Sequence, residues 1–578
     1  MVSAISKLRT LGCFLLALAA SGQASLFAQN LRYEAETAQR TGVNVASSVG
    51  GYSGTGYVTG FDSGAGTDKV QWQVDVPNGL YEMWVGYRSQ FGPKGYNFHV
   101  DGEGGSGMFD QSNAFTTDRA GLFNLQNVTN TFSIEQSWGY YDVDYVEFRP
   151  FTPPTLAPVS SQLVDDEANA RTRFLMNYLT DMYGEKTLSG QQHNVSQNQS
   201  FPGATYLAKS GGLTPAIRGS DFMEYSPSRR QFGSNPRNET EQTIAWAQQT
   251  GGVVSMMWHW NAPANLINTS GKEWWRGFYT DATTFNLPGA LANPAGSDYQ
   301  LLLRDIDAIA VELQKFETAG VPVIWRPLHE AQGGWFWWGA HGPDTFKQLW
   351  NLTYDRLTNH HDLHNLIWEF TSSAAEGNFR DWYPGDDVVD MIGLDIYTDA
   401  SASMSGQWYD MVEEYDGRKM IALSETGTLP NPTVMEQWGI NWSYFSPWSG
   451  SFVDAFTAQQ LQATLGHENI ITLNELPMMP WNAAAPVSAD FNGDGLVDGN
   501  DLLVWQQQLG QSGDLAADGN GDGAVDADDL AVWRSQFGQN AGAAGQASVP
   551  EPAAIVMLGV AVATSLAARR WRHTARRC

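Results

Sequence analysis

The sequence predicts a multidomain protein in which a (β/α)8 TIM barrel is preceded by a β-sandwich and followed by a small α-helical pair. Three patterns predict this order. Short segments that alternate polar and apolar residues fill residues 31–150, helix and strand patterns then take turns over residues 160–477, and an internal repeat covers residues 490–540. A chain of 578 residues is also too long for a single hydrophobic core.

Composition narrows the classes of function. The net charge of -29 excludes nucleic-acid binding, because neutralising phosphates requires an excess of Lys and Arg. The 23 Trp and 21 Tyr permit carbohydrate binding, since sugar rings stack on flat aromatic faces. Most of these aromatics are equally explained as side chains that fill domain cores.

The N-terminus has the pattern of a secretory signal peptide over residues 1–28. Lys7 and Arg9 precede the apolar run Leu11–Ala20, and small residues follow as far as Ala28. The apolar run is too short to span a membrane as a stable helix, so we expect this segment to be removed on export.

The C-terminal residues 549–578 also look like a targeting segment. The motif "VPEP" precedes the apolar run Ala553–Ala568 and the basic end "RRWRHTARR". This arrangement resembles the PEP-CTERM sorting signal of Gram-negative bacteria, which implies recognition by sorting machinery; a tail anchor is the alternative. The only cysteines are Cys13 and Cys578, so the body of the chain has no disulfide.

Residues 31–150 are expected to form the β-sandwich. Polar and apolar residues alternate in Lys69–Val76, Tyr81–Tyr87 and Asn97–Asp101, and turn residues separate these segments. The Pro-rich stretch "FTPPTLAP" marks residues 151–159 as a linker.

Three motifs give this first domain a family resemblance. "YEAE", "GYSGTGYV" and the closing "WGYYDVDYVEF" resemble carbohydrate-binding module family 35. The resemblance implies a structural calcium held by Glu34, Glu36 and Asp144, whose hard oxygen ligands suit that ion. Trp138 is the candidate platform for sugar, and a place in the sandwich core is the alternative.

Helix and strand patterns alternate from residue 160 onward. Asp298–Phe316 is expected to form a helix that ends at Gly320, before a strand that begins at Val321. Its apolar residues recur at three- and four-residue spacing on one face: Leu302, Ile306, Ile309, Leu313 and Phe316.

Eight strand-like runs follow one another in residues 160–477. They are "TLSGQQH", "TPAIRGSD", "VVSMMWHW", "VPVIW", "NLIWEFTS", "VVDMIGLDIY", "KMIALSETG" and "GINWSYFSPW". Eight strands alternating with helices favour a (β/α)8 barrel, whose functional groups gather where the strands end.

Two carboxylates come at the ends of these runs. Glu330 follows the fourth run and Glu425, in "SETG", ends the seventh. Hydrolysis of a glycosidic bond with retention needs two carboxyl groups about 5–5.5 Å apart, one as proton donor and one as nucleophile. Strand ends on one barrel rim can bring such a pair together.

The motifs around these carboxylates resemble glycoside hydrolase family 26, best known for β-mannanases. They are "TLSGQQH", "MMWHW", "IWRPLHE" with "GGWFWWG", "YPGDDVVDMIGLDIY", "SETG" and "SPW", in the order expected of the family. The resemblance implies that Glu330 is the general acid/base and Glu425 the nucleophile, with no cofactor for catalysis.

The same resemblance implies roles for neighbouring side chains. His329 would orient the acid or the substrate, Tyr397 would hydrogen-bond the nucleophile, and His259 would contact sugar hydroxyls. Trp335 and Trp448 would stack against sugars. Phe336–Trp338 fit a core equally well, and Asp395 is left as structural.

A linker over residues 478–489 leads into the repeat, whose copies begin at Asp490 and Asp518. Oxygen ligands fall at positions 1, 3, 5, 9 and 12 of a calcium loop in each copy, and Gly495 and Gly523 occupy position 6. These ligands are Asp490, Asn492, Asp494, Asp498 and Asp501, and then Asp518, Asn520, Asp522, Asp526 and Asp529. Paired loops of this kind resemble dockerins, which implies a cohesin-like partner.

These predictions combine into one expected function. The chain would be a secreted or surface-displayed retaining endo-β-1,4-mannanase that cleaves mannan, galactomannan or glucomannan. A β-1,3-xylanase or mixed-linkage β-glucanase is the alternative with the same chemistry. The alternative from another functional class is a non-catalytic polysaccharide-binding protein. Such a protein would be expected to lack Glu330 or Glu425, and both are present.

Overall fold

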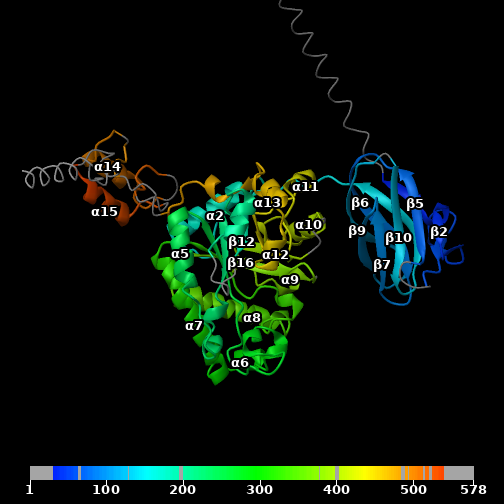
Figure 1. Ribbon diagram of the computed structural model, residues 1–578, viewed down its shortest axis with the longest axis horizontal. Coiled ribbons are helices and arrows are strands. Elements are labelled where there is room, and N and C mark those ends of the chain that lie inside the picture. Colours follow the sequence, from blue (N-terminus) through cyan, green and yellow to red (C-terminus); the bar gives the residue numbers. More distant parts are fainter. Residues whose placement is uncertain are drawn as a thin grey trace, which may run out of the picture. The chain divides into compact units, whose positions relative to one another are not determined.

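Figure 1 shows the computed structural model of the chain. The expected signal peptide and sorting tail, half of the second linker, and Asn520 and Asp522 of the repeat lie outside the described residues. In the part of the chain that is described, no helix is long and apolar enough to cross a membrane. The structure describes residues 30–62, 67–127, 129–193, 200–376, 378–397, 403–482, 489–492, 494–511, 515–519 and 524–538.

The N-terminal domain consists of two antiparallel sheets, as expected for a β-sandwich (Figure 1). The first sheet has the order β3 (Asn44–Ala46), β4 (Tyr57–Thr59), β11 (Asp142–Pro150), β6 (Gly79–Ser89) and β9 (Ser112–Leu125), and β1 (Leu31–Glu34) pairs with β11. The second sheet has the order β2 (Gln39–Thr41), β5 (Lys69–Asp75), β10 (Thr129–Trp138), β7 (Lys94–Val100) and β8 (Glu103–Phe109).

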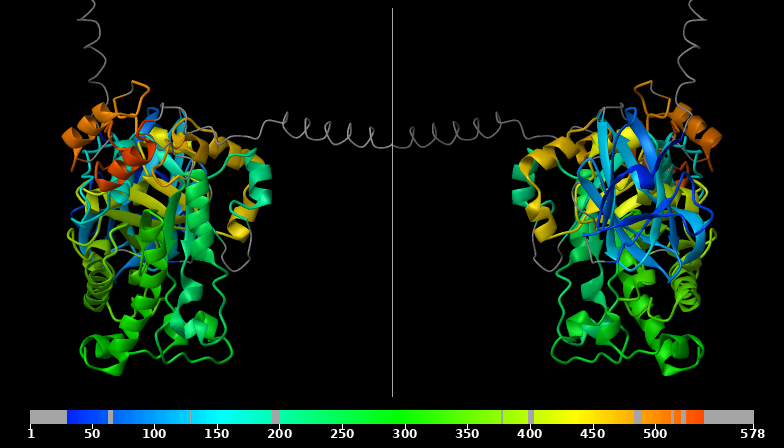
Figure 2. Two further views of the ribbon diagram at one scale, coloured as in Figure 1. Left: turned by 90° about the vertical axis from the view of Figure 1, so that its left-hand side faces the viewer. Right: turned by 90° about the vertical axis from the view of Figure 1, so that its right-hand side faces the viewer.

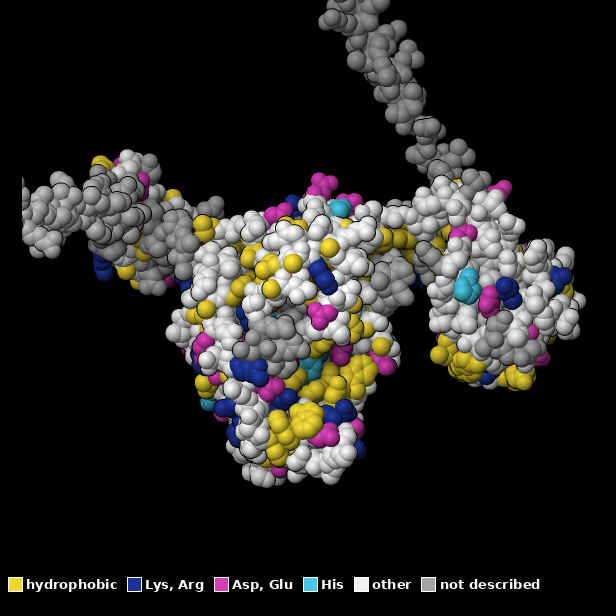
Figure 3. Space-filling view, in the orientation of Figure 1, with side chains coloured by type: hydrophobic (Ala, Val, Ile, Leu, Met, Phe, Trp, Pro, Cys, Tyr) yellow, Lys and Arg dark blue, Asp and Glu magenta, His cyan; other side chains and the backbone are white. Residues whose placement is uncertain are grey.

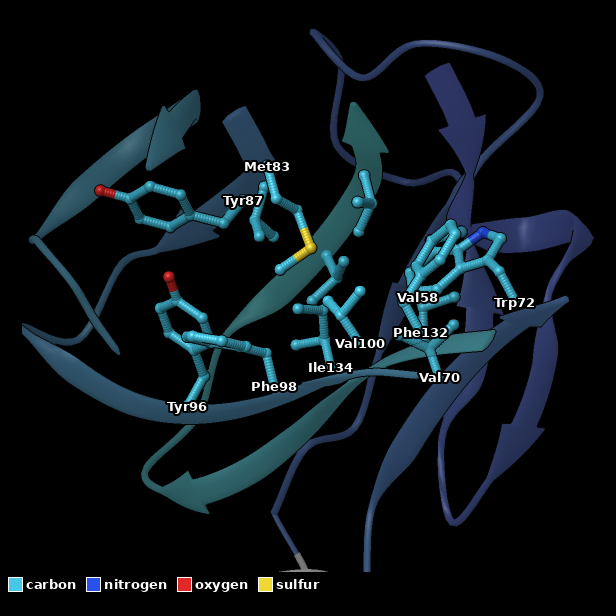
Figure 4. Close-up of a cluster of buried hydrophobic side chains, with 14 of the residues drawn as sticks. Val58, Val70, Trp72, Met83, Tyr87, Tyr96, Phe98, Val100, Phe132 and Ile134 are labelled. Atoms are coloured by element: carbon cyan, nitrogen blue, oxygen red, sulfur yellow. The ribbon is translucent and has the colours of Figure 1, made fainter. Parts of the chain in front are cut away.

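Alternating residues of these strands form the sandwich core. Val70 and Trp72 of β5 are buried beside Phe132 and Ile134 of β10, because every second side chain of a strand points to the same face (Figure 4). The alternation of polar and apolar residues that predicted the strands therefore also predicts which side chains lie in the core.

The central domain is a parallel barrel that closes between its first and second strands. The strand order runs from β13 to β19 and then to β12, which pairs with β13 again, so the prediction of eight parallel strands is confirmed. The strands are β12 (Thr187–Gln192), β13 (Ile217–Asp221), β14 (Val253–Met257), β15 (Val323–Arg326), β16 (Leu366–Ser373), β17 (Met391–Ile396), β18 (Ile421–Thr426) and β19 (Tyr444–Pro447). The short β20 (Ile470–Ile471) pairs with β12 from outside the barrel.

Helices cover the barrel between successive strands (Figure 2). The helix expected over 298–316 is α7 (Ser297–Thr318), and all five residues of its expected apolar face are buried. The other helices are α2 (Ala170–Met182), α3 (Ala204–Ser210), α4 (Pro227–Arg230), α5 (Glu239–Thr250), α6 (Leu287–Leu291), α8 (Pro343–Tyr354), α9 (Phe379–Trp382), α10 (Ser405–Glu414), α11 (Pro432–Trp438), α12 (Ser451–Ala455) and α13 (Ala458–Leu465).

The C-terminal repeat forms two helices, α14 (Gly499–Gln508) and α15 (Ala527–Gln536). The Trp505 indole N–H donates to the carbonyl of Asp526 at 2.7 Å, and the Trp533 indole N–H donates to the carbonyl of Asp498 at 2.8 Å. A tryptophan of each copy therefore forms a hydrogen bond with the loop of the other copy.

Candidate active site

Glu330 lies in the loop after β15, not at the end of the strand as the sequence suggested. β15 ends at Arg326, and Glu330 itself has a φ of 54°, in the left-handed region that non-glycine residues seldom adopt. Its backbone N–H donates to the carbonyl of Thr371 on β16 at 3.1 Å. Backbone strain of this kind concentrates at functional sites and is maintained by the surrounding structure.

Glu425 lies on β18, at the same rim of the barrel. Carboxylate oxygens of Glu330, Asp395 and Glu425 all lie within 4.8 Å of one another. The fold therefore brings together two carboxyl groups that are far apart in the sequence, at a separation close to that of retaining glycosidases.

Two donors hold the Glu425 carboxylate in place. The Tyr397 hydroxyl donates to its Oε2 at 2.8 Å, and the Arg326 guanidinium donates to its Oε1 at 3.1 Å. Tyr397 therefore occupies the position expected of it. Arg326 belongs to the "IWRPLHE" motif, but no pattern in the sequence predicted this contact.

Arg326 is fully buried and faces three carboxylates. Besides Glu425, its Nη2 lies 3.0 Å from Asp395 Oδ2 and its Nε lies 3.6 Å from Glu369 Oε1. Burial opposes a charged guanidinium, but these carboxylates outweigh burial and raise the pKa of Arg326. Because this guanidinium already occupies the cationic position of the cluster, the three carboxylates do not form a free metal site.

Asp395, which the sequence left as structural, has a carboxylate oxygen within 4.8 Å of oxygens of both Glu330 and Glu425. Burial raises the pKa of Asp395 well above its ordinary value, and the nearby Glu425 and Glu330 add to the rise, which Arg326 opposes. The Ser424 hydroxyl donates to Asp395 Oδ1 at 2.8 Å. Asp395 thus anchors the guanidinium that in turn holds Glu425.

Glu330 is the carboxyl group that favours the protonated form. Burial, followed by the charge of Glu425, raises its pKa from 4.5 to about 7, although the Trp335 indole N–H donates to its Oε2 at 3.0 Å and opposes the rise. A carboxyl group that keeps its proton near neutral pH can act as a general acid.

Two buried histidines line the site beside Glu330. His259 Nδ1 lies 2.7 Å from Asp221 Oδ2, and its Nε2 lies 3.3 Å from His329 Nε2. Burial alone would lower the pKa of His259, but Asp221 outweighs burial and raises it. Burial, His259 and Arg326 lower the pKa of His329 well below its ordinary value, which favours the neutral imidazole.

The two histidines differ in exposure as well as in hydrogen bonding. Both ring nitrogens of His259 are engaged within the protein, whereas His329 Nδ1 is buried and has no hydrogen-bond partner among the described residues. His259 nevertheless keeps 7% of its surface exposed, against 1% for His329. Contact between His259 and a sugar hydroxyl therefore stays a prediction.

The aromatic residues after Glu330 divide into two groups. Trp335 is half-buried and borders the site, whereas Phe336, Trp337 and Trp338 are buried and belong to the core. Trp448 is half-buried, with its ring centroid 5.9 Å from that of His259. Both expected stacking residues thus keep part of their surface open.

The predicted residues of the sandwich lie in two separate places. Trp138, at the end of β10, is 50% exposed, so its alternative place in the core is wrong. Glu34, Glu36 and Asp144 surround the turn 53–55, whose backbone N–H groups donate to Asp144 and Glu36. The Ser53 hydroxyl donates to Glu34 at 2.6 Å.

These three carboxylates are the candidate ligands of the structural calcium that the sequence predicts. Burial, with the charges of Glu34 and Glu36, raises the pKa of Asp144 to about 6, although the Ser53 N–H opposes the rise. Glu36 Oε2 is buried without a hydrogen-bond partner among the described residues. Crowded carboxylates with an unpaired oxygen are what a hard cation such as calcium would stabilise.

The first loop of the C-terminal repeat is folded by its own acidic side chains. Asp501 is buried and accepts backbone N–H bonds from Phe491, Asn492 and Asp498. Asp490 accepts from the backbone of Asp494 at 3.1 Å. All of the candidate ligands in this loop are oxygen donors, which suits calcium, and Asp529 repeats the Asp501 arrangement in the second copy.

Family models match three parts of the chain. Glycosyl hydrolase family 26 matches residues 164–474, carbohydrate binding module family 35 matches residues 31–151, and the dockerin type I domain matches residues 488–536. These matches cover the barrel, the sandwich and the helical repeat in turn.

Curated and solved relatives resemble the chain over most of its length. A mannan endo-1,4-beta-mannosidase of Thermothelomyces thermophilus is 38% identical over 488 residues, which is 81% of this chain and 98% of that protein. The crystal structure of a Podospora anserina GH26-CBM35 beta-(1,4)-mannanase is 39% identical, with a TM-score of 0.56 over 77% of this chain and 98% of that one. A ruminal GH26 endo-beta-1,4-mannanase is 27% identical, with a TM-score of 0.62 over 78% of this chain and 99% of that one.

Proposed function

Because the chain belongs to glycosyl hydrolase family 26 and is therefore a glycoside hydrolase, we propose that it is a secreted, retaining endo-β-1,4-mannanase. The retaining mechanism is supported by one distance: carboxylate oxygens of Glu330 and Glu425 lie within 4.8 Å of each other. This spacing leaves no room for the water molecule that an inverting enzyme needs between its carboxyl groups.

In the first step, Glu425 attacks the anomeric carbon of the sugar. The bond from that carbon to the glycosidic oxygen breaks, and the proton of Glu330 passes to the departing oxygen. The raised pKa of Glu330, about 7, supplies the protonated form that this step requires. The result is a covalent glycosyl–Glu425 ester and an ionised Glu330.

In the second step, water releases the product. Glu330 now takes a proton from the water, the water oxygen bonds to the anomeric carbon, and Glu425 leaves as a carboxylate. Two inversions at one carbon restore the original configuration. Glu330 ends the cycle protonated, ready for the next sugar.

The surrounding side chains position the reacting groups. Arg326 and Tyr397 fix the Glu425 oxygens from two directions, which orients one oxygen toward the anomeric carbon. His259 would contact a sugar hydroxyl, His329 would orient the acid or the substrate, and Trp335 and Trp448 would stack on sugars beside the cleavage point.

The choice of mannan rests on the relatives. Those described above are named as mannanases, and their alignments cover 77–81% of this chain. Hydrolysis of β-1,3-xylan or of mixed-linkage β-glucan would use the same two carboxylates and is therefore an outcome that the experiment below distinguishes.

The segments on either side of the barrel would bind polysaccharide, bind a partner protein and direct export of the chain. We assign residues 31–150 to polysaccharide binding through Trp138, residues 160–477 to catalysis, and residues 490–540 to a calcium-stabilised repeat that binds a cohesin-like protein. Glu34, Glu36 and Asp144 would hold a second calcium. The terminal segments would direct export to the cell surface of a Gram-negative bacterium.

The test is hydrolysis by the full chain of β-mannan, β-1,3-xylan and mixed-linkage β-glucan. We expect mannooligosaccharides, whose first-formed anomer by proton NMR has the β configuration. Glu330→Gln and Glu425→Gln, which keep side-chain volume, should each abolish turnover. Cleavage of another polymer alone would show that mannan is not the substrate. A first-formed product in the α configuration would refute the retaining mechanism. No cleavage of any of the three polymers by a folded chain would refute the proposed activity.

A further inference from the structure

Glu369, on β16, is a buried carboxyl group that takes no part in the two catalytic steps. On the face of the barrel shown in Figure 3, acidic and basic side chains lie at the surface, where water solvates them. Glu369 and Arg326 are instead 0% exposed. Taking a carboxylate out of water in this way is costly unless other groups compensate its charge.

Two hydroxyl groups and one guanidinium compensate Glu369. The Tyr444 hydroxyl, from β19, donates to Glu369 Oε2 at 2.6 Å, and the Thr371 hydroxyl donates to Glu369 Oε1 at 3.3 Å. Arg326 Nε lies 3.6 Å from the same Oε1. Burial raises the pKa of Glu369, whereas the charge of Arg326 and the hydrogen bond from Tyr444 oppose the rise. Each oxygen of Glu369 therefore has a partner.

Thr371 connects Glu369 to both reacting groups. The Arg326 Nε–H donates to the Thr371 hydroxyl at 3.1 Å, and that hydroxyl in turn donates to Glu369. The Nη1 and Nη2 atoms of the same guanidinium lie 3.1 and 3.2 Å from Oε1 of Glu425. The carbonyl of Thr371 accepts the backbone N–H of Glu330 at 3.1 Å. One short stretch of β16 therefore supports both the nucleophile and the acid.

Glu369 and Thr371 engage the edge of the guanidinium that the other carboxylates leave open. Nη1 of Arg326 donates to Glu425, and Nη2 donates to Asp395 at 3.0 Å. A planar guanidinium keeps one orientation when donors on several of its edges are engaged. Without the contact at Nε, the guanidinium would be free to turn, and the Glu425 carboxylate would move with it.

The neighbouring strand leaves room for this arrangement. Gly393, on β17, faces Glu369 and Thr371. A Cβ at this position would collide with Glu369 Oε1 and would lie 2.5 Å from the Thr371 hydroxyl oxygen. A glycine inside a strand marks a place where another group approaches the backbone closely. The buried carboxylate therefore fits because residue 393 has no side chain.

We infer that Glu369 is a positioning residue for the nucleophile, acting on Glu425 through Thr371 and Arg326. This inference rests on the proposed function, because it concerns the attack of Glu425 on the sugar. Glu369 also shares the positive charge of Arg326, which leaves the Glu425 oxygen more reactive. Since Glu369 is fully buried, it does not contact the substrate, and its loss should slow the chemical step without weakening binding.

The test uses Glu369→Gln in the full chain, which keeps the size of the side chain and removes its charge. We expect kcat on mannohexaose to fall about 10–100-fold, because a small displacement of reacting groups has an effect of that size. KM should stay within about twofold of the wild type, because the interaction acts on the transition state.

A second measurement isolates the nucleophile. Glu425 is labelled with 2-deoxy-2-fluoro-β-mannobiosyl fluoride, and the labelled chain is counted by intact mass spectrometry. An ester forms between Glu425 and the anomeric carbon, and fluoride leaves without needing a proton from Glu330. The labelling rate therefore reports on Glu425 alone, and it should fall in Glu369→Gln by about the same factor as kcat.

Two further variants complete the comparison. Tyr444→Phe removes the hydrogen bond to Glu369 and should slow labelling in the same direction by a smaller factor. Asp390→Asn is the matched control, since Asp390 is also a buried carboxyl group of the barrel but accepts the backbone N–H groups of Val164 and Trp368. It should lower Tm while kcat and the labelling rate stay at the wild-type values.

The outcomes separate positioning from activity and from stability. Wild-type labelling in Glu369→Gln, or a raised KM with unchanged kcat, would refute the positioning role and leave the mannanase proposal intact. An equal loss in Asp390→Asn would also refute it, because any damage to the barrel core would then have the same effect. If Glu369→Gln does not fold, Tyr444→Phe decides: slower labelling supports the role and wild-type labelling refutes it. A wild type that is neither labelled nor able to cleave mannan would overturn both proposals.

Discussion

Replacing the Glu425 carboxylate with a neutral amide should lower the pKa of Glu330. Glu425→Gln keeps the size of the side chain and its contacts with Tyr397 and Arg326, but it removes the negative charge. Burial is the largest cause of the raised pKa of Glu330, and the charge of Glu425 is the second. The variant therefore removes one of the two causes and leaves the other.

The size of the change follows from the geometry. The closest oxygens of the pair lie within 4.8 Å, and two unit charges about 5 Å apart interact by about 3 kcal/mol at an effective dielectric constant of about 20. That energy corresponds to about two pKa units at most. Because burial contributes the larger part of the rise from 4.5 to about 7, we expect a fall of about one unit.

Carbon-13 NMR titration of glutamate δ carbons in the full chain measures this change directly. The Glu330 resonance is assigned by its loss in Glu330→Gln, and its midpoint is compared between the wild type and Glu425→Gln. An unchanged or higher midpoint in the variant would show that Glu425 does not tune the acid, and it would remove the electrostatic basis of the assignment.

Three further results are expected. In the wild type, kcat/KM on mannan should fall as the pH rises through about 7, because Glu330 then loses the proton that it donates; a profile that stays flat above that pH would contradict its role as the acid. Tyr397→Phe removes a hydrogen bond to a charged group, worth about 1.5–3 kcal/mol, so kcat should fall by about 10–100-fold with circular dichroism unchanged, whereas a change within about twofold would leave Tyr397 without a role. Trp138→Ala should weaken pull-down by insoluble mannan without affecting hydrolysis of soluble oligosaccharides, and undiminished pull-down would place sugar binding elsewhere.

The barrel could be predicted from the sequence because its signals are local. Each strand is a short apolar run, and the helix α7 shows its buried face through residue spacing alone. The two catalytic candidates could be selected as well, since each carboxylate follows such a run and the fold places strand ends on one rim.

The electrostatic support of the site could not be predicted in this way. Arg326, Asp395 and Glu369 come from three different strands, and only their distances of 3.0 and 3.6 Å show that they act together. Likewise, the hydrogen bond between His259 and Asp221 depends on the pairing of β13 with β14. Long-range pairing of polar groups leaves no pattern along the chain.

The closure of the barrel has a consequence for biosynthesis. β12 is the first barrel strand to leave the ribosome, yet Leu188 pairs with Tyr444 of β19 and with Ile471 of β20. One edge of β12 therefore stays open until almost the whole domain has been made, whereas the sandwich is complete once β11 has emerged. An unpaired strand edge is prone to aggregation, so a nascent barrel needs protection that the sandwich does not. Chains truncated before Ile471 should accumulate as insoluble protein.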